Sequence, residues 1–322
     1  MQRVPERDAA CYTRGAVRIL FITSTRIGDA VLSTGLLDHL IRTHPHAKVV
    51  VACGPVAEGV FARMPSRAWT IVLTKRRFRA HWWELWRQVA GQRWDIVVDL
   101  RGSAFSWLVR AKRRYVMRGG RQPGHRLAHL GALLGLDPPP LPVAWFGPAE
   151  RARAAALLPG DGIWIGLGPT ANWDRKVWPA DRFVALYRAL TAPGAPLEGA
   201  RAAILGGPGA QERAMAAPVL AALGEAAVDL VGGLSLPEVA AVLARCALFV
   251  GNDSGLMHLS AATGTPTLGL FGPSPVEAYA PAGRRTATAV APGSPGLDSM
   301  PGLTLETALA AAERLLAAKV PA

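Results

Sequence analysis

Two kinds of segment alternate along this chain: short apolar runs that end in Gly, Ser, Asp or Thr, and longer stretches with helical periodicity. Such alternation is typical of βα units, in which helices connect parallel strands and cover the faces of their sheet. The pattern runs through the first half of the chain and again through the second. We therefore expect an α/β protein with two doubly wound domains, each built on its own parallel sheet.

The expected strands lie at residues 17–23, 48–53, 69–73, 95–100, 163–167, 201–205, 228–231, 248–250 and 267–271. The expected helices lie near residues 29–43, 56–64, 81–90, 105–113, 124–134, 179–190, 210–223, 236–245, 255–263 and 305–318. A proline-dense stretch at residues 136–142 can continue neither a helix nor a central strand. We place the domain boundary near residue 150, with domains at 1–150 and 151–322. The last helix belongs to the second domain by position, although it can also pack back on the first.

The net charge of +13 lies entirely in the first domain. Residues 1–150 hold 23 Lys and Arg against 10 Asp and Glu, and the remainder holds 13 against 13. A basic domain beside a neutral one suggests different partners, with the basic domain facing nucleic acid, anionic lipid or a phosphorylated glycan. The alternative is a generally solubilising, arginine-rich surface.

Several classes of protein lose support from features that the sequence lacks. No apolar run reaches the roughly 18 residues of a membrane-spanning helix, and the charged first 18 residues fit neither a signal peptide nor a transit peptide. Cys11, Cys53 and Cys246 form no CxxC pair, so we expect a reduced, cytoplasmic protein without structural zinc. No metalloprotease, P-loop or dinucleotide-binding motif is present.

A polar turn follows one expected strand of the second half and leads into an alanine-rich helix, with the sequence Gly251-Asn-Asp-Ser-Gly-Leu-Met-His258. Asp253 or Ser254 can cap this helix, and Gly255 allows a ligand to approach the backbone. The free N–H groups and the positive end of the helix dipole suit a diphosphate, with His258 as a further donor. The alternative is an ordinary capped helix with a core histidine.

Two further loops are expected at the same edge of the second sheet. One carries Thr170, Asn172 and Lys176, a donor-rich set whose lysine can neutralise a phosphate. The other is glycine-rich and carries Gln211 and Glu212, either of which can accept hydrogen bonds from a ribose. The alternatives are a solvated loop lysine and a plain turn with a helix-capping acid.

In the first half, the first expected strand meets a short loop and then an amphipathic helix. Gly28 stands at the turn and Asp29 at the start of the helix. An aspartate at the mouth of a cleft between domains can act as a general base toward an acceptor hydroxyl within hydrogen-bond reach. Position alone favours the alternative, in which Asp29 is the N-cap of the helix.

Several spaced motifs occur in order along residues 17–316. They are Arg18-Ile-Leu-Phe-Ile, Arg26-Ile-Gly-Asp-Ala-Val-Leu-Ser-Thr-Gly-Leu-Leu37, Gly168-Pro with Lys176-Val-Trp-Pro179, Gly206-Gly-Pro208, the turn ending at His258, Gly264-Thr-Pro-Thr267, and Phe271-Gly-Pro273. Their conjunction resembles glycosyltransferase family 9, the ADP-heptose:lipopolysaccharide heptosyltransferases. The resemblance implies the GT-B fold, in which two Rossmann-like domains face each other across a cleft.

The resemblance also implies an inverting, metal-independent transfer of a heptose or related sugar, with a nucleotide sugar as donor substrate, ADP-heptose above all, and no cofactor. Asp29 falls on the family's catalytic base and Lys176 on its phosphate-binding lysine. Asp29 would deprotonate the acceptor hydroxyl while Lys176 stabilises the leaving diphosphate. We expect the remaining positions to bind the nucleotide sugar: Gly28, Thr170, Asn172, Glu212, Asp253, Ser254, Gly255 and His258.

The basic first domain fits an anionic lipopolysaccharide-core or lipid-linked glycan acceptor. Nucleic acid is not expected, because no nucleic-acid-binding motif accompanies the charge. Residues 75–87 combine five basic residues with Phe78, Trp82, Trp83 and Trp86, which suits peripheral contact with the anionic inner face of the inner membrane. The favoured alternative is that this segment simply packs as a helix on the sheet.

Two other functional classes remain open from the sequence. A nucleotide-sugar epimerase with the GT-B fold would use the same donor half but would need no basic acceptor surface, so the charge distribution argues against it. A non-catalytic module that only binds a sugar nucleotide would lack a competent Asp29, and only an assay excludes it.

Overall fold

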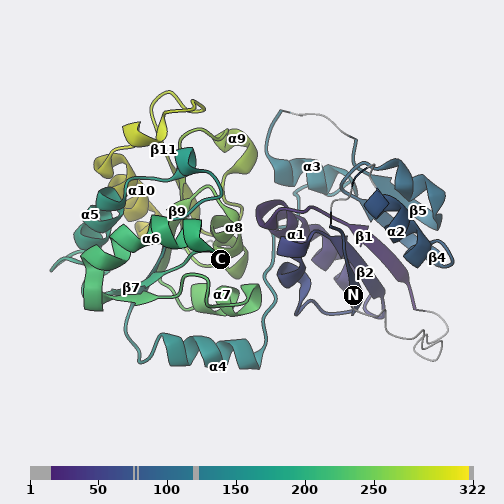
Figure 1. Cartoon of the computed structure of the whole chain (residues 1–322), viewed down its shortest axis with the longest axis horizontal. Coiled ribbons are helices and arrows are strands. Elements are labelled where there is room, and N and C mark those ends of the chain that lie inside the picture. The colour runs from purple at the N-terminus through teal and green to yellow at the C-terminus, as the bar shows by residue number, and fades with distance from the viewer. Residues whose placement is uncertain (1–15, 75–76, 78–79, 119–122, 319–322) are drawn as a thin grey trace.

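The computed structural model describes residues 16–74, 77, 80–118 and 123–318, which form two parallel sheets, each covered by helices (Figure 1). The first sheet has five strands in the order β3-β2-β1-β4-β5. They are β1 (Arg18–Ile22), β2 (Lys48–Cys53), β3 (Arg67–Val72), β4 (Arg93–Asp99) and β5 (Arg110–Val116). The helices of this half are α1 (Ile27–Thr43), α2 (Ala80–Val89) and α3 (Arg126–Ala132), with 3-10 helices η2 (Pro55–Phe61) and η4 (Ala104–Leu108).

The second sheet has six strands in the order β11-β10-β9-β6-β7-β8. They are β6 (Trp164–Gly168), β7 (Arg201–Ile204), β8 (Ala227–Asp229), β9 (Leu248–Asn252), β10 (Thr267–Phe271) and β11 (Thr286–Val290). The helices are α4 (Pro148–Leu157), α5 (Ala180–Thr191), α6 (Ala210–Leu223), α7 (Leu236–Leu243), α8 (Gly255–Thr263), α9 (Val276–Tyr279) and α10 (Leu305–Ala317), with 3-10 helices η5 (Asp174–Lys176), η6 (Gly224–Ala226) and η7 (Met300–Gly302). All strand pairs in both sheets are parallel, as the βα alternation predicts.

The central strands are apolar throughout because helices cover both of their faces. In β1, Ile19 and Phe21 belong to the core on the side of α1, whereas Leu20 and Ile22 belong to the core on the side of α2. All four side chains are fully buried. This two-sided burial explains why β1 reads as a continuous apolar run rather than as an alternating one.

Each sheet reverses its winding direction beside its first strand, since β1 lies next to β4 and β6 lies next to β9. The loops at the carboxyl ends of two such strands diverge and leave a crevice in which ligands bind. In the first sheet these are the loops after β1 and β4, and in the second they are the loops after β6 and β9. The sequence places Asp29, Lys176 and Asp253 in three of these four loops or at the helix starts that follow them.

The two domains meet where α1 crosses α8 (Figure 1). A glycine stands on each side of this contact. A Cβ atom on Gly28 would lie 2.9 Å from His258 Cδ2, and one on Gly255 would lie 2.8 Å from Ile27 Cβ. The absence of side chains at these two positions therefore lets the first turns of the two helices approach each other.

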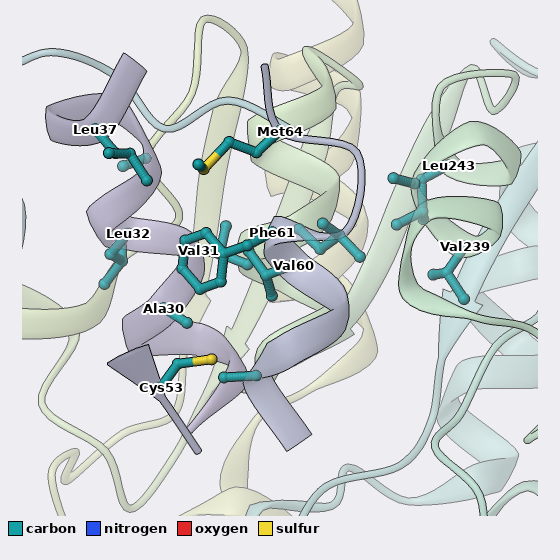
Figure 2. Close-up of a cluster of buried hydrophobic side chains, with 14 of the residues drawn as sticks. Ala30, Val31, Leu32, Leu37, Cys53, Val60, Phe61, Met64, Val239 and Leu243 are labelled. Carbon is teal, nitrogen blue, oxygen red and sulfur yellow. The ribbon is translucent and has the colours of Figure 1, made fainter. Parts of the chain in front are cut away.

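A second contact between the domains joins η2 to α7. Val60, Phe61 and Met64 of the first domain share one hydrophobic cluster with Val239 and Leu243 of the second (Figure 2). Because this cluster continues the core on the side of α1, the two domains are held by packed apolar surface as well as by the helix crossing.

An ion pair lies beside this cluster. Arg63 donates from Nε to Glu150 Oε1 over 2.8 Å and from Nη2 to the same oxygen over 2.6 Å. Glu150 Oε2 also accepts a hydrogen bond from the Gly147 backbone N–H at the start of α4. These bonds, with the Arg63 side chain first, lower the pKa of Glu150. One carboxylate thus caps α4 and ties it to the first domain.

The helix expected at residues 105–113 is wrong. Residues 104–108 form η4, and the chain then enters β5, whose side chains are all at least partly exposed. The Arg114 guanidinium holds this turn by donating to the carbonyl groups of Ser106 and Val109. As an edge strand rich in cations, β5 lacks the apolar run that identifies the central strands.

Other elements also differ from the sequence-based expectation. Strand β11, again at an edge, and helices α4 and α9 were not predicted, and residues 55–61 form a 3-10 helix instead of an α-helix. Helix α4 contains residue 150 and packs against α7, whereas α10 packs on α5, β10 and β11 of its own half rather than on the first domain. The boundary near residue 150 stays a prediction.

The proline-dense stretch forms neither helix nor strand, and its end packs closely on α1. A Cβ atom on Gly35 would contact the carbonyl oxygens of Pro140 and Leu141, and Val143 donates its backbone N–H to Thr34 Oγ1 over 2.9 Å.

Burial raises the pKa of Cys53 and of Cys246 to about 12, which fits inert core thiols, and Cys11 lies outside the described residues. Among the helices described, none has the length and apolar character needed to cross a membrane.

Candidate active site

Asn252, the last residue of β9, holds together the two loops at the switch point of the second sheet. Its Oδ1 accepts a hydrogen bond from the Trp178 backbone N–H over 3.0 Å, and its Nδ2 donates to the Thr170 carbonyl over 3.4 Å. Both Asn252 and Thr170 are buried. The sequence shows Asn252 within the Gly251–His258 turn, but only the structure reveals that it positions the loop with Lys176.

Lys176 and Asp253 form a close ion pair at this switch point. Lys176 Nζ lies 2.6 Å from Asp253 Oδ2, and the side chains are 21% and 9% exposed, respectively. The two residues are thus brought together as the convergence of the loops predicts. Of the two residues expected to cap α8, Ser254 and not Asp253 occupies the N-cap position.

Ser254 occupies the N-cap position of α8, but its side chain makes no cap hydrogen bond. Its hydroxyl is buried, as is Nδ1 of His258, and neither atom has a hydrogen-bond partner within the described part of the chain. Buried polar atoms without partners are uncommon in folded proteins and call for an explanation. A ligand with anionic oxygens, bound at the start of α8 beside Lys176, would explain these unpaired atoms.

His258 lies at the contact between the domains, 4% exposed, with Nε2 4.0 Å from Asp253 Oδ1. Burial lowers the pKa of His258 below the ordinary value of 6.5, although Asp253 and Asp29 act in the opposite direction. The influence of Asp29 shows that the first domain brings its aspartate into electrostatic range of the histidine. His258 is therefore neutral near pH 7 and offers one N–H and one acceptor nitrogen.

The lowered pKa of His258 predicts a pH dependence of stability. Below about pH 6.5 the unfolded chain binds a proton at this residue that the folded chain resists. Stability therefore falls as the pH drops from about 6.5 toward the folded pKa, and it rises with pH over the same window. We expect His258→Gln to reduce this slope in urea-unfolding midpoints measured across pH 5 to 7.5. The exposed His46 provides the control, since His46→Gln should leave the slope as in the original protein; equal slopes for all three proteins would contradict the assignment.

Asp29 is the third residue of α1, and the N-cap position belongs to Arg26. The interpretation of Asp29 as the N-cap is therefore wrong. Its Oδ2 accepts a hydrogen bond from Ser24 Oγ over 3.4 Å. The carboxylate lines a pocket of about 280 Å³ at the switch point of the first sheet, together with Thr23, Ser24, Leu100, Arg101, Met117, Arg118, Arg126 and Leu130.

Three arginines share this pocket with Asp29, and the loop after β4 places one of them. Asp99, fully buried at the end of β4, accepts hydrogen bonds from the Arg101 backbone N–H and from the backbone N–H and hydroxyl of Ser103. Neither Arg101 nor Asp99 was predicted from the sequence as a site residue. A buried aspartate at the end of a strand, followed by a cation two residues later, is the signal that points to them.

Glu212 accepts a hydrogen bond from the Gly207 backbone N–H over 2.9 Å and shapes the glycine-rich loop after β7. Beside this loop lies an open pocket of about 440 Å³, lined by Gly207, Pro208, Gly209, Ala210, Arg213, Val231, Gly232 and Gly233. Glu212 is not among the lining residues, and Asn172 is exposed on the loop after β6. The structure thus brings Lys176, Asp253 and His258 together and places Glu212 and Asn172 on neighbouring loops.

No group of three or more His, Cys, Asp or Glu side chains suited to holding a metal ion occurs among the residues that the structure describes. The cationic groups at the second switch point are instead Lys176 and the start of α8. Two helix starts, those of α1 and α8, meet beside them at the domain contact.

The model of glycosyltransferase family 9 (heptosyltransferase) matches residues 124–295, more than half of the chain. Lipopolysaccharide heptosyltransferase 1 of Pseudomonas aeruginosa is 28% identical over 297 residues, which cover 80% of this chain and 79% of that protein. The solved structure of a family 9 glycosyltransferase from Veillonella parvula has a TM-score of 0.76 and 22% identity, covering 93% of this chain and 97% of that one. That of the Escherichia coli ADP-heptose lipopolysaccharide heptosyltransferase II also has a TM-score of 0.76, with 21% identity and coverage of 93% and 98%.

These likenesses confirm the fold expected from the sequence, two Rossmann-like domains in the GT-B arrangement. The family match spans the loops that carry Lys176, Glu212 and Asp253, and the relative from P. aeruginosa extends the similarity over most of the chain. The sequence motifs, the assembled loops and the family model agree, and the chain belongs to glycosyltransferase family 9 and is a glycosyltransferase.

Proposed function

We propose that this protein transfers a heptose from ADP-heptose to a lipopolysaccharide-core acceptor by an inverting displacement that needs no metal ion. The observation that carries the proposal is the meeting of two sites at the domain contact. Asp29 comes from the first domain and the Lys176–Asp253 pair from the second, and His258 lies in electrostatic range of all three residues.

The donor site is proposed at the switch point of the second sheet. Lys176 and the start of α8 offer positive charge to a diphosphate, and the buried Ser254 hydroxyl can donate to one of its oxygens. The pocket beside the glycine-rich loop has room for the nucleoside, near Glu212. The names of the relatives, which act on lipopolysaccharide or use ADP-heptose, support the choice of donor.

The acceptor site is proposed in the pocket that Asp29 lines. Arg101, Arg118 and Arg126 share that pocket, and guanidinium groups bind carboxylates and phosphates through paired hydrogen bonds. An anionic sugar of a lipopolysaccharide core has these groups. Three of the basic side chains of the first domain therefore lie where the acceptor hydroxyl must approach its base.

In the proposed mechanism, the Asp29 carboxylate takes the proton of the acceptor hydroxyl as that oxygen attacks the anomeric carbon. The bond from the anomeric carbon to the diphosphate oxygen breaks with its electron pair, and ADP leaves from the opposite face, which inverts the configuration. Lys176 and the N–H groups at the start of α8 stabilise the charge that develops on the diphosphate. These groups supply fixed positive charge, so the proposal requires no bound cation.

The test is release of ADP from ADP-heptose by the purified protein, with and without heptose-deficient lipopolysaccharide core, in the presence and absence of EDTA. We expect release only with acceptor, unchanged by EDTA, and a product of inverted anomeric configuration by NMR. Sensitivity to EDTA that added metal reverses would refute the metal-independent mechanism. Interconversion of the nucleotide sugar without acceptor would favour an epimerase, and binding of ADP-heptose without turnover under any acceptor would favour a binding module.

A further inference from the structure

An aromatic surface lies on the first domain, outside the proposed site. It consists of Trp83 and Trp86 of α2 with Trp107 and Leu108 of η4, and we call it the α2–η4 surface. Trp83, Trp107 and Leu108 are 61%, 67% and 64% exposed. The rings of Trp83 and Trp86 stack with centroids 4.7 Å apart, and Trp86 Nε1 donates to the Leu108 carbonyl over 3.0 Å. Trp86 thus joins the two elements, which carry the exposed Trp83, Trp107 and Leu108 side chains.

Packing of α2 on the sheet does not account for this patch. Leu85 and Val89 are the side chains of α2 that are fully buried against the sheet, on the face opposite α1. Trp83 points away from that core, as its exposure shows. The favoured sequence interpretation, helix packing, is thus correct for Leu85 and Val89 but leaves Trp83, Trp107 and Leu108 unexplained. Contiguous exposed apolar side chains of this kind mark an interaction surface.

The segment that carries the α2–η4 surface is rich in cations. Residues 80–118 contain eight Lys and Arg against three Asp and Glu. Two of the three acids already have partners. Asp95 pairs with Lys112, and the buried Asp99 accepts hydrogen bonds within its own turn. Arg87 of α2 and Arg110 at the start of β5 are exposed, and the Arg114 guanidinium lies 5.1 Å from the Trp107 ring centroid.

The surface adjoins the pocket that contains Asp29. Arg101 lines that pocket, and its guanidinium lies 5.9 Å from the ring centroid of Trp82, which stacks on Phe105 of η4. Arg101 therefore connects the pocket with α2, the helix that carries Trp83 and Trp86. Whatever the α2–η4 surface contacts is held next to the proposed acceptor site.

We propose that the α2–η4 surface docks on a bilayer of anionic phospholipid. Tryptophan is suited to the level of the lipid headgroups, because its ring is apolar and its N–H remains hydrogen-bonded. The arginines of this segment reach the phosphates of the same leaflet, each adding electrostatic attraction. This places the membrane contact at Trp83, Trp107 and Leu108; of the segment 75–87 named from the sequence, residues 75–76 and 78–79 lie outside the described part.

The test is sedimentation of the full chain with vesicles of phosphatidylcholine alone or mixed with phosphatidylglycerol. We expect binding to the anionic vesicles that weakens with added salt. The variant Trp83→Ser/Trp107→Ser/Leu108→Ser should bind at least about tenfold more weakly, because three apolar contacts with the interface are lost. The variant Arg87→Gln/Arg110→Gln should lose part of the preference for anionic lipid while keeping the tryptophans.

A matched control replaces exposed apolar residues of the second domain, Ile163→Ser/Leu297→Ser, and should bind as the original protein does. Failure of the original protein to prefer anionic vesicles, or equal binding by the triple variant, would overturn the proposal. A triple variant that changes the mass of the protein in solution without changing its vesicle binding would assign the surface to contact between copies. The triple variant should still transfer heptose to a soluble, delipidated core. If the original protein bound vesicles but transferred no heptose, the proposed function would be refuted and the membrane-docking proposal would stand.

Discussion

Asp29→Asn is expected to lower the rate of acceptor-dependent transfer by about 10²–10⁴-fold, the range typical for loss of a general base. The amide has nearly the same shape as the carboxylate and keeps the hydrogen bond from Ser24 Oγ, so the fold should be unchanged. It cannot take the proton of the acceptor hydroxyl. Initial rates of ADP release, with both substrates saturating, measure the effect.

Asp38→Asn is the matched control for this prediction. Asp38 lies on the same helix and pairs with the exposed Arg42, away from the pocket that Asp29 lines. We expect transfer by this variant at the original rate, because exposed ion pairs contribute little. Affinity for ADP, measured by calorimetry, should be the same in both variants and the original protein. If Asp29→Asn transferred heptose at the original rate, Asp29 would not be the base.

Lys176→Met is expected to reduce kcat/KM for the donor by about 10²–10³-fold, as removal of one group that stabilises developing charge commonly does. It should also destabilise the second domain, because Asp253, 9% exposed, would lose the ion-pair partner that lies 2.6 Å away. Adding Asp253→Asn should recover most of the lost stability and none of the transfer. Thermal unfolding and donor kinetics of the single and double variants separate the two effects.

The neighbouring Arg175 provides the comparison for Lys176. It is 48% exposed and pairs with Asp298, which is itself exposed. Arg175→Ala removes a cation from the same loop at little cost in stability, and we expect a change in kcat/KM of less than about threefold. An equal loss from Arg175→Ala and Lys176→Met would show that the general positive charge of the loop matters, and not the position of the lysine.

Most of the fold could be predicted from the sequence because its central strands are buried on both faces. Strands such as β1 and β9 have no polar side on which to mix apolar and charged residues, so they stand out as short apolar runs. The edge strands β5 and β11 do not. In β5, four of the seven residues are cations that can face solvent, and the same pattern is compatible with a helix.

The candidate site could be predicted only in part. The loops with Lys176 and Asp253 carry recognisable motifs, and parallel strands bring their carboxyl ends to one edge, so their meeting follows from the order of the chain. The role of Asn252 in tying these loops does not follow, since its partners are backbone groups distant in sequence. Arg101 is one cation among many in a basic domain, and only the turn around Asp99 places it beside Asp29.

The two glycines at the domain contact have a consequence for building chimeric enzymes from this family. Joining the first domain of this protein to the second domain of a relative takes more than matched ends near residue 150. Gly28 must accommodate a ring from the other half, and Gly255 must accommodate Ile27, at distances where even one methyl group would collide. A second domain from a relative can therefore be exchanged only together with the first turn of α1 that packs against it. The donor specificity of such hybrids thus depends on Gly28 and Gly255.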